Sequence, residues 1–457
     1  MSTLICSRIR LTYFININAS RNKQNKILEK VNKIVYNINI RTFVHFERVI
    51  VTDRVILHCD LNNFFASASI TQNPSLKLLP VAVCGDTEKR HGIVLAKNNI
   101  AKKRGVKTAE AIWEAKLKCP ELVTVSPDYS LYKKFSNMAK EIYLSYSDKV
   151  EPFGIDECWV DISNRGVTYE TGVKTANEIR QKIKSYIGIT VSVGVSFNKT
   201  FAKLGSDLKK PDAVTLISPE NFKEKIWPLK CSDMIMVGKA TEASLKSLGI
   251  FSIGDLAAAD EGALIKKLGK NGRLLKKIAM GEDDGDVSVF SNAAMPKSIS
   301  HSETSEKDLT TYEEIFSSML KFSEDICESL KNHRLMAKTV SIHLLTNDFQ
   351  KKEVQAPLDF PTDISAVIAE KAMQLFKSKF TLKKPFRAVG VRVTGLESYN
   401  SASKQLNLFD NEERIQTLET IEDKIINIRS KYGKDSLKRA ICIKPSAKKP
   451  GSDIKNM

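Results

Sequence analysis

Two acidic segments, each set beside an apolar stretch, constrain this chain more than any other feature. Asp60 closes the strand-like run at 55–59, and Asp156 and Glu157 follow Gly154 about a hundred residues later. Carboxylates at strand ends suit Mg²⁺, which prefers oxygen ligands in near-octahedral geometry. Two such ions about 3.5–4 Å apart could bridge these three carboxylates, as in phosphoryl transfer. Taken alone, either segment would more often be a solvated turn, but together they predict a two-metal site.

The composition indicates a folded protein with a polyanionic partner. The 71 Lys and Arg against 53 Asp and Glu leave a formal charge of +18, and 42% hydrophobic residues are too many for a disordered basic tail alone. Residues 1–50 account for +7 of this charge, which leaves +11 for residues 51–457. A chain of 457 residues can form three or four domains, each with its own core.

Cysteine usage and hydropathy exclude several classes of protein. The eight cysteines form no CxxC pair and no Cys/His cluster, which argues against a zinc site and against a secreted disulfide framework. We expect them to be reduced and mostly buried. No stretch of 18 apolar residues occurs, and Arg8 and Arg10 interrupt the only early hydrophobic segment. We therefore expect a cytoplasmic protein with no membrane span.

Residues 1–50 differ from the rest of the chain. They are rich in Asn, Ile and Lys, contain neither Gly nor Pro, and precede the first clear strand at 55–59 without a regular period. We interpret them as an extension outside the fold. Translation would then start at Val51, through a valine codon read as an initiator.

The first half of the chain alternates between helical and strand patterns. Between 62 and 130, short helices and strands predict a small α/β insertion, with helices at 63–71, 96–103 and 109–118 and strands at 80–84, 93–95 and 123–126. The pattern then predicts a helix at 131–149, a hairpin at 150–162, a helix at 171–185 and a strand at 189–197. This βαβ-like order brings the two acidic segments into one sheet.

The second half begins with short helices joined by glycine turns between 232 and 281. After a linker-like stretch at 288–298, a last domain mixes helices at 312–332 and 363–378 with strands at 337–345 and 386–395. The tail from about 397 is polar and contains a helical pattern at 411–431.

A pair of lysines follows the strand at 189–197. Lys199 and Lys203 are spaced i,i+4, so they share one face near a helix start, where free N–H groups and the helix dipole favour a phosphate. An ordinary solvated basic face would show the same spacing.

Four motifs together resemble the Y-family DNA polymerases, in the branch of bacterial DNA polymerase IV that performs translesion synthesis. They lie at 57–67, 92–98, 153–161 and 198–211, in the family's order and with similar spacing, and the likeness spans about 53–410. The resemblance implies an α+β, multidomain right-hand polymerase. Its parts would be a palm (51–62 and 128–217), small fingers (63–127), a helical thumb with a helix-hairpin-helix-like turn (218–290), an α/β little finger (297–396) and a tail (397–457).

The resemblance also implies roles for individual residues. Asp60 and Asp156 would bridge two Mg²⁺ ions, the backbone carbonyl of Leu61 would be a further ligand, and Glu157 would be the catalytic acid beside the primer 3′-hydroxyl. Phe65 falls at the steric gate that excludes a 2′-hydroxyl. The other implied contacts are with the nucleotide (Phe64, Phe65, Lys102, Lys203), with DNA (Gly238, Lys239, Lys297, Ser298) and with a sliding clamp (Gln405, Leu406, Leu408, Phe409).

Three positions depart from the family's pattern. Asn62 stands where the family commonly has a second acid, and Asn99 and Lys102 stand where it commonly has a Tyr and an Arg on the triphosphate. Lys102 keeps the positive charge but lacks the bidentate fork of an arginine. Nucleotide affinity or fidelity could differ as a result.

The sequence therefore predicts a template-directed DNA polymerase of the translesion type, without proofreading. Its partners would be primer-template DNA, deoxynucleoside triphosphates and a sliding clamp, and it would act as a monomer. The alternative is a catalytically impaired, polymerase-like DNA-binding protein, which the three departures leave open. A nucleotidyl cyclase would share a palm but has no use for a helix-hairpin thumb or a clamp peptide.

Overall fold

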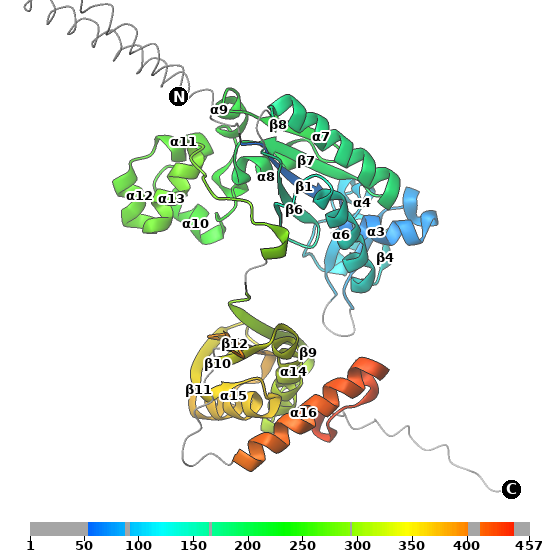
Figure 1. Cartoon of the computed structure of the whole chain (residues 1–457), viewed down its shortest axis with the longest axis vertical. Helices are drawn as coiled ribbons and strands as arrows, with labels where there is room; N and C mark the ends of the chain where they lie inside the picture. The colour runs from blue at the N-terminus through cyan, green and yellow to red at the C-terminus, as the bar shows by residue number, and fades with distance from the viewer. Residues whose placement is uncertain (1–53, 87–91, 164–166, 293–294, 401–411, 443–457) are drawn as a thin grey trace, which may run out of the picture. The chain divides into compact units, whose positions relative to one another are not determined.

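The computed structural model describes residues 54–86, 92–163, 167–292, 295–400 and 412–442 (Figure 1). These residues divide into two units, and each unit is considered by itself. One runs up to Thr71 and continues over Tyr129–Asn292, and the other comprises Gln72–Asp128 and the chain from 295 onward. The expected extension at 1–50, the expected start at Val51 and the peptide at 405–409 lie outside the described residues.

A five-stranded sheet forms the centre of the first unit. Its order is β5 (Val150–Pro152), β6 (Glu157–Asp161), β1 (Ile56–Leu61), β7 (Val191–Ser196) and β8 (Val214–Ile217). All six residues of β1 are buried, and β1 runs antiparallel to both β6 and β7. The predicted hairpin around Gly154 is confirmed as β5 and β6, and the two acidic segments do lie in one sheet.

Helices cover both faces of this sheet. They are α3 (Phe64–Gln72), α6 (Tyr129–Leu144), α7 (Tyr169–Lys182), which ends in a π-helical turn (Ile183–Ile187), and α8 (Lys199–Leu208). Leu57, Cys59 and Leu61 of β1 share a core with residues of α6 and α7. Ile56 packs instead with Ala202 of α8. Because side chains alternate along a strand, His58 and Asp60 also point to the α8 side.

Close contact between α8 and β7 fixes the position of α8. A Cβ atom on Gly194 would lie 1.8 Å from the carbonyl oxygen of Ala202 and 2.6 Å from the nitrogen of Ser206. The helix starts at Lys199 because the side chain of Asn198 accepts a hydrogen bond from Phe201 N–H, at 2.7 Å. The absent side chain at 194 therefore lets α8 lie directly on the strand.

The chain from 222 to 279 consists of short helices. They are α9 (Phe222–Ile226), α10 (Lys239–Lys246), α11 (Ile253–Ala258), α12 (Glu261–Leu268) and α13 (Lys270–Ala279). Their apolar residues form one core with Phe201 and Leu204 of α8. Gly249 and Gly269 have positive φ angles of 76° and 63°, a conformation that favours glycine. The expected glycine turns between short helices are confirmed there.

The segment 72–128 of the second unit contains a three-stranded sheet. Its order is β3 (Val94–Lys97), β2 (Val81–Cys84) and β4 (Val123–Val125), accompanied by α4 (Asn99–Lys103) and α5 (Ile112–Lys118). The helix predicted at 96–103 begins too early, since Lys97 pairs with β2 and Asn98 caps the helix by accepting from Ala101 N–H. The predicted α/β insertion is otherwise present.

The segment from 295 onward contains a second large sheet. Its order is β11 (Lys351–Thr362), β10 (Leu335–Thr346), β12 (Phe386–Thr394) and β9 (Ser298–Leu309), with the short β13 (Glu397–Ser398) beside β10. Helices α14 (Tyr312–His333) and α15 (Ser365–Lys379) share its apolar core. The sequence did not predict β9 and β11, because both are edge strands with largely exposed, polar residues.

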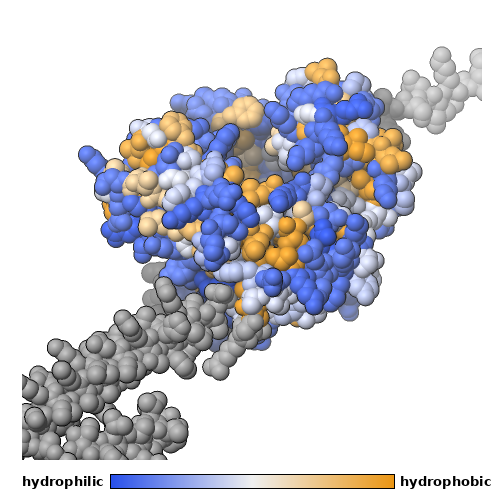
Figure 2. Space-filling model, turned by 90° about the horizontal axis from the view of Figure 1, so that it is seen from above, coloured by the Kyte–Doolittle hydropathy of each residue, from blue (hydrophilic) through white to orange (hydrophobic). Residues whose placement is uncertain are grey.

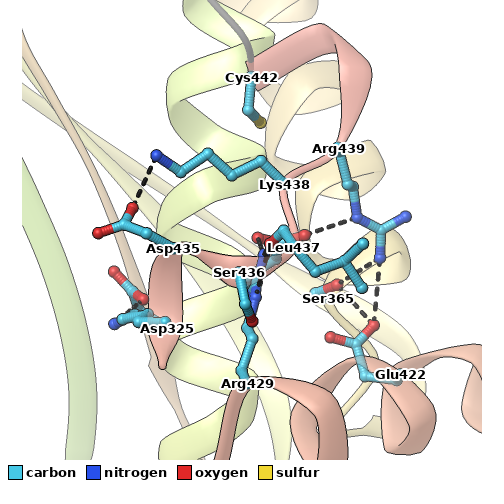
Figure 3. A network of polar contacts seen from close by, with 12 residues as sticks. Asp325, Ser365, Glu422, Arg429, Asp435, Ser436, Leu437, Lys438, Arg439 and Cys442 are labelled. Atoms are coloured by element: carbon cyan, nitrogen blue, oxygen red, sulfur yellow. Dashed lines mark hydrogen bonds and ion pairs between the residues drawn. The ribbon is translucent and has the colours of Figure 1, made fainter. Parts of the chain in front are cut away.

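A helix beyond this sheet packs against α14 and α15 through buried charges. The helix is α16 (Glu412–Tyr432), and the predicted helical pattern at 411–431 is confirmed. Arg429 and Arg439 both bond the buried carboxylate of Glu324 on α14, at 3.0 and 2.6 Å. Glu422 accepts from the Ser365 hydroxyl, and Arg439 reaches the same pair (Figure 3). The polar tail thus includes a packed element of the fold.

The described cysteines are free, and six of these seven are buried, as expected from the sequence. Among the described helices, none is both long and apolar enough to cross a membrane. The face in Figure 2 is largely hydrophilic, with hydrophobic residues gathered in separate patches.

Replacement of Gly194 by Ala is expected to lower the free energy of unfolding by about 1–3 kcal/mol, because the new methyl group overlaps the α8 backbone. Chemical denaturation at equilibrium measures this loss. Gly262→Ala is the matched control: Gly262 is an exposed residue of α12, and a Cβ there would meet only the side chain of Asp260. An equal effect of both changes would contradict the assigned packing.

Candidate active site

The structure brings the four predicted metal-site residues to one end of the central sheet. Asp60 lies directly opposite Glu157 in the pairing of β1 with β6. Asp156 precedes β6, and its carbonyl oxygen accepts a hydrogen bond from the N–H of Leu61 at 3.1 Å. Residues far apart in the sequence therefore meet because two antiparallel strands place their ends side by side.

Each of two carboxylates has a lysine partner. Asp60 Oδ2 accepts from Lys210 Nζ, and Glu157 Oε2 accepts from Lys203 Nζ, both at 2.6 Å. Lys203 lies on α8, so the close approach of that helix to β7 places its charge at the site. The nucleotide contact expected of Lys203 stays a prediction. Lys210 was part of a motif in the sequence but had received no role.

The surroundings shift the pKa values of these carboxyl groups in opposite directions. Burial raises the pKa of Asp60 to about 7 against the opposing Lys210 ammonium, and the charges of Glu157 and Asp156 add to the rise. Burial also raises the pKa of Asp156. In Glu157 burial is outweighed by the contacts with His58 and Lys203, which lower the pKa to about 2. The site therefore crowds negative charge that a cation would relieve.

The carboxylates do not form a closed ligand cage. Among the described residues, no group of three or more His, Cys, Asp or Glu side chains has the arrangement of a metal site. Two of the carboxylates turn to lysine ammonium groups instead. Those ammonium groups supply the positive charge beside the acids, and a metal ion would have to draw the carboxylates from them.

Asn62 is a structural residue in this fold. Its side-chain nitrogen donates to Ser192 Oγ at 2.9 Å, and its oxygen accepts from Thr190 Oγ1 at 3.0 Å and from Asp212 N–H at 2.8 Å. The side chain is only 3% exposed. These hydrogen bonds tie three chain segments together, and the amide both donates and accepts in them, which an ionised carboxylate could not do.

An aromatic cluster holds Phe65. Its ring stacks on Tyr132 at 4.2 Å with an interplanar angle of 7°, and Tyr129 meets both rings nearly at right angles. Tyr132 is fully buried and its hydroxyl lies 3.1 Å from Ser69 Oγ. Phe64 is 3% exposed and belongs to the core, so it can affect the site only through its neighbours.

Lys199 is bound within the fold rather than facing a free surface. Its ammonium group bonds Glu151 Oε1 at 2.6 Å and lies 4.5 Å from the centre of the Trp159 ring. It also donates to the carbonyl oxygen of Asp286 at 3.3 Å. These contacts favour a structural role for Lys199 over the phosphate contact considered from the sequence.

The remaining predicted residues lie on exposed surfaces of either unit. Gly238 caps α10 and Lys239 is its first residue, and both are exposed. In the second unit, Lys102 is an exposed residue of α4, which starts at Asn99, and Lys297 and Ser298 are exposed around the start of β9. The clamp peptide residues Gln405, Leu406, Leu408 and Phe409 lie outside the described residues.

Sequence reasoning missed two residues that contact the acids. Lys210 binds Asp60, and His58 Nε2 lies 3.6 Å from Glu157 Oε2. The alternation of side chains along β1 could have placed His58 on the same face as Asp60. The partner of Lys210 depends on the fold, because 150 residues separate the two.

Comparison with known proteins identifies the family. Residues 59–207 match the impB/mucB/samB family, 219–250 match the HHH motif of the same family, and 296–408 match its C-terminal domain. Together these matches span more than half of the chain.

Named relatives and a solved structure agree with this match. The chain is 46% identical over 390 residues to a DNA polymerase IV of Acetivibrio thermocellus, with 85% of this chain and 98% of the relative covered. It is 33% identical over 396 residues to DNA polymerase IV 1 of Bacillus subtilis, with 87% and 95% covered. A Y-family DNA polymerase chimera shares the fold, with a TM-score of 0.67, 23% identity, and 75% of this chain and 99% of the chimera covered. The chain therefore belongs to the impB/mucB/samB family, among the Y-family DNA polymerases of the DNA polymerase IV type, which are metal-dependent translesion enzymes.

Proposed function

We propose that this polymerase adds deoxynucleotides to a primer 3′-hydroxyl with Asp60, Asp156 and Glu157 as its catalytic carboxylates. The observation that carries the proposal is the meeting of these acids at one sheet end, beside Lys203 and Lys210. A DNA template would direct the addition, pyrophosphate would leave, and no proofreading step would follow.

The donor set fits two Mg²⁺ ions. Its members are carboxylate oxygens and one backbone carbonyl, which are hard ligands of the kind that Mg²⁺ prefers. Burial raises the pKa of Asp60 and of Asp156, and the neighbouring carboxylates add to the rise, so a bound cation would stabilise the ionised forms of both groups. Asp60, Asp156, Glu157 and the carbonyl of Leu61 would hold the ions. When bound, the ions would lower the pKa of the 3′-hydroxyl and neutralise the triphosphate.

The protein's own side chains prepare the site for this reaction. Glu157 is ionised far below neutral pH, so its carboxylate is available beside the primer terminus. Lys203 donates to Glu157 in the structure, and it would turn from there to the triphosphate of the incoming nucleotide. Lys210 holds Asp60 in place while no cation is present. Charge is thus arranged before substrate arrives, which lowers the cost of reorganisation.

Phe65 would select the sugar of the nucleotide by shape. The stack on Tyr132 fixes the ring of Phe65, and buried aromatic packing leaves it little freedom to yield. A 2′-hydroxyl would then meet a ring that cannot move aside. A fixed Phe65 ring would thus exclude ribonucleotides by steric clash, without adding any contact that favours deoxynucleotides.

We further propose the expected division into palm (51–62 and 128–217), fingers (63–127), thumb (218–290), little finger (297–396) and tail (397–457). Exposed Gly238 and Lys239 at the start of α10 would bind a DNA phosphate through backbone N–H groups and charge. Lys297 and Ser298 would contact the DNA backbone, and Lys102 the triphosphate. The chain would act as a monomer in the cytoplasm.

The peptide at 405–409 would dock on a sliding clamp. Its Gln405, Leu406, Leu408 and Phe409 carry the pattern that supports this proposal. A tether to the clamp would raise the local concentration of the enzyme at the primer end without new DNA contacts. The alternative of an impaired DNA-binding protein is not favoured, because all three carboxylates are in place and the relatives are polymerases.

Primer extension with Asp156→Asn tests the proposed function. The rate is expected to fall roughly a thousandfold or more, because several kcal/mol of charge stabilisation are lost at about 1.4 kcal/mol per factor of ten. Asp161→Asn is the control, since Asp161 is a buried carboxylate at the other end of β6 and pairs with Lys149. Template-dependent extension that survives in Asp156→Asn would refute the assigned site.

Replacement of Phe65 by Ala is expected to raise the ratio of ribonucleotide to deoxynucleotide incorporation by about tenfold or more, because the wall beneath the sugar is removed. Single-nucleotide insertion kinetics measure this ratio. Tyr132→Phe is the matched control, since it keeps the stacked ring and loses only the hydroxyl near Ser69. An unchanged ratio in Phe65→Ala would exclude the gate.

Replacement of Leu408 and Phe409 by Ala is expected to leave unassisted extension unchanged and to abolish stimulation by the clamp, since both apolar contacts with the clamp are lost. Processivity on a primed circular template with a loaded clamp measures the effect. The control replaces Ile421 and Ile428, two exposed apolar residues of α16, by Ala. Equal stimulation of the peptide variant and the wild type would contradict the assignment.

A further inference from the structure

A fully buried histidine lies behind the proposed catalytic carboxylates. His58 stands on β1 two residues before Asp60 and has no exposed surface. Its Nδ1 lies 2.9 Å from Ser206 Oγ on α8, and its ring meets the Trp159 ring edge-on, with 5.3 Å between centroids. The imidazole is therefore fixed from two sides.

The other ring nitrogen faces Glu157. His58 Nε2 lies 3.6 Å from Glu157 Oε2, which is longer than a hydrogen bond, and Nε2 has no hydrogen-bond partner among the described residues. A buried polar atom without a partner is costly and calls for an explanation. Contacts in active sites are often long before substrate binds and tighten in the reactive complex.

Lys203, the present hydrogen-bond partner of Glu157, is expected to move away when the nucleotide binds. Oε2 accepts from Lys203 Nζ at 2.6 Å, and within the described residues no hydrogen bond or ion pair reaches Oε1. Once Lys203 turns to the triphosphate, Oε2 loses this bond. Among the described residues, His58 already places a possible donor, its Nε2, opposite Glu157 Oε2.

We propose that His58 is a positioning residue for Glu157, whose Nε2–H holds Oε2 when Lys203 moves to the nucleotide. The inference rests on the proposed roles of Glu157 and Lys203. Oε1 then stays free for the reacting groups. Nδ1 must accept from the Ser206 hydroxyl, so that the ring hydrogen sits on Nε2. In the structure this hydroxyl donates to the carbonyl oxygen of Lys203 at 2.7 Å, so the proposal requires it to rotate toward Nδ1 when Lys203 moves, and that rotation selects the required tautomer.

Two amide substitutions separate this role from a purely structural one. In His58→Gln the amide nitrogen can take the place of Nε2 and reach Glu157. In His58→Asn the shorter side chain can reach only the Nδ1 side, toward Ser206. If His58 positions Glu157, only His58→Gln should keep the rate of nucleotide addition. If His58 serves only to hold α8, only His58→Asn should keep it.

Single-turnover nucleotide addition at saturating nucleotide measures the effect. His58→Asn is expected to lower the maximal rate constant by about tenfold or more, because a carboxylate that loses its position costs rate without costing substrate binding. It should also raise the Mg²⁺ concentration that gives half the maximal rate, with the nucleotide Kd nearly unchanged. His58→Gln should stay within about threefold of the wild type.

The controls exclude loss of folded protein and general effects of losing a histidine. The burst amplitude gives the concentration of active enzyme, and rate constants are referred to that concentration. An unfolded fraction of the protein therefore does not lower the rate constant. His343→Asn is the matched control, because His343 Nδ1 also faces a carboxylate, 3.3 Å from Glu353 Oε2, in the other unit. It should retain the wild-type rate constant.

Three results would overturn the inference: a wild-type rate constant in His58→Asn, a loss that His58→Gln shares in full, or rescue by Asn but not by Gln. Glu157→Ala tests the underlying function separately. If Glu157→Ala loses extension and His58→Asn does not, only the role of His58 fails. If Glu157→Ala keeps extension, the proposed site fails regardless of the histidine variants.

Discussion

The pairing of β1 with both β6 and β7 is the constraint on which the rest of the site depends. It places Asp60 opposite Glu157 on one side and gives α8 a strand to pack against on the other. The approach of α8 requires Gly194, because any side chain there would overlap the helix backbone. One short helix then brings Lys203 to Glu157 and Ser206 to His58. Sheet register and helix packing together therefore set the chemistry.

Electrostatic conflict is built into this arrangement. Carboxylates brought together with little solvent repel one another, and the lysines offset only part of that repulsion. In the proposed function this conflict favours the binding of cations and a triphosphate, and the lysines would exchange partners as substrate arrives. A fully neutralised cluster would be more stable but would have less to gain from binding.

Much of the fold could be predicted from the sequence, and the failures have physical causes. Apolar residues recur regularly in the hairpin of β5 and β6 and in the helices α14 and α15, and this pattern was sufficient to predict these elements. The edge strands β9 and β11 are mostly polar and exposed, and carry little such signal. The tail looked polar because α16 buries only a few apolar residues, such as Ile415, and is also held by buried ion pairs such as that of Arg429 with Glu324, which an apolar pattern does not reveal.

The sequence by itself determined the family, the fold class and which residues could be catalytic, because motif order and residue type are properties of the chain. Only the tertiary structure decided what those residues touch. Asn62 proved to be a structural amide, Lys199 a partner of Glu151, and His58 a neighbour of Glu157. These outcomes depend on contacts across large sequence separations. Such contacts are set by register and packing, which local patterns do not encode.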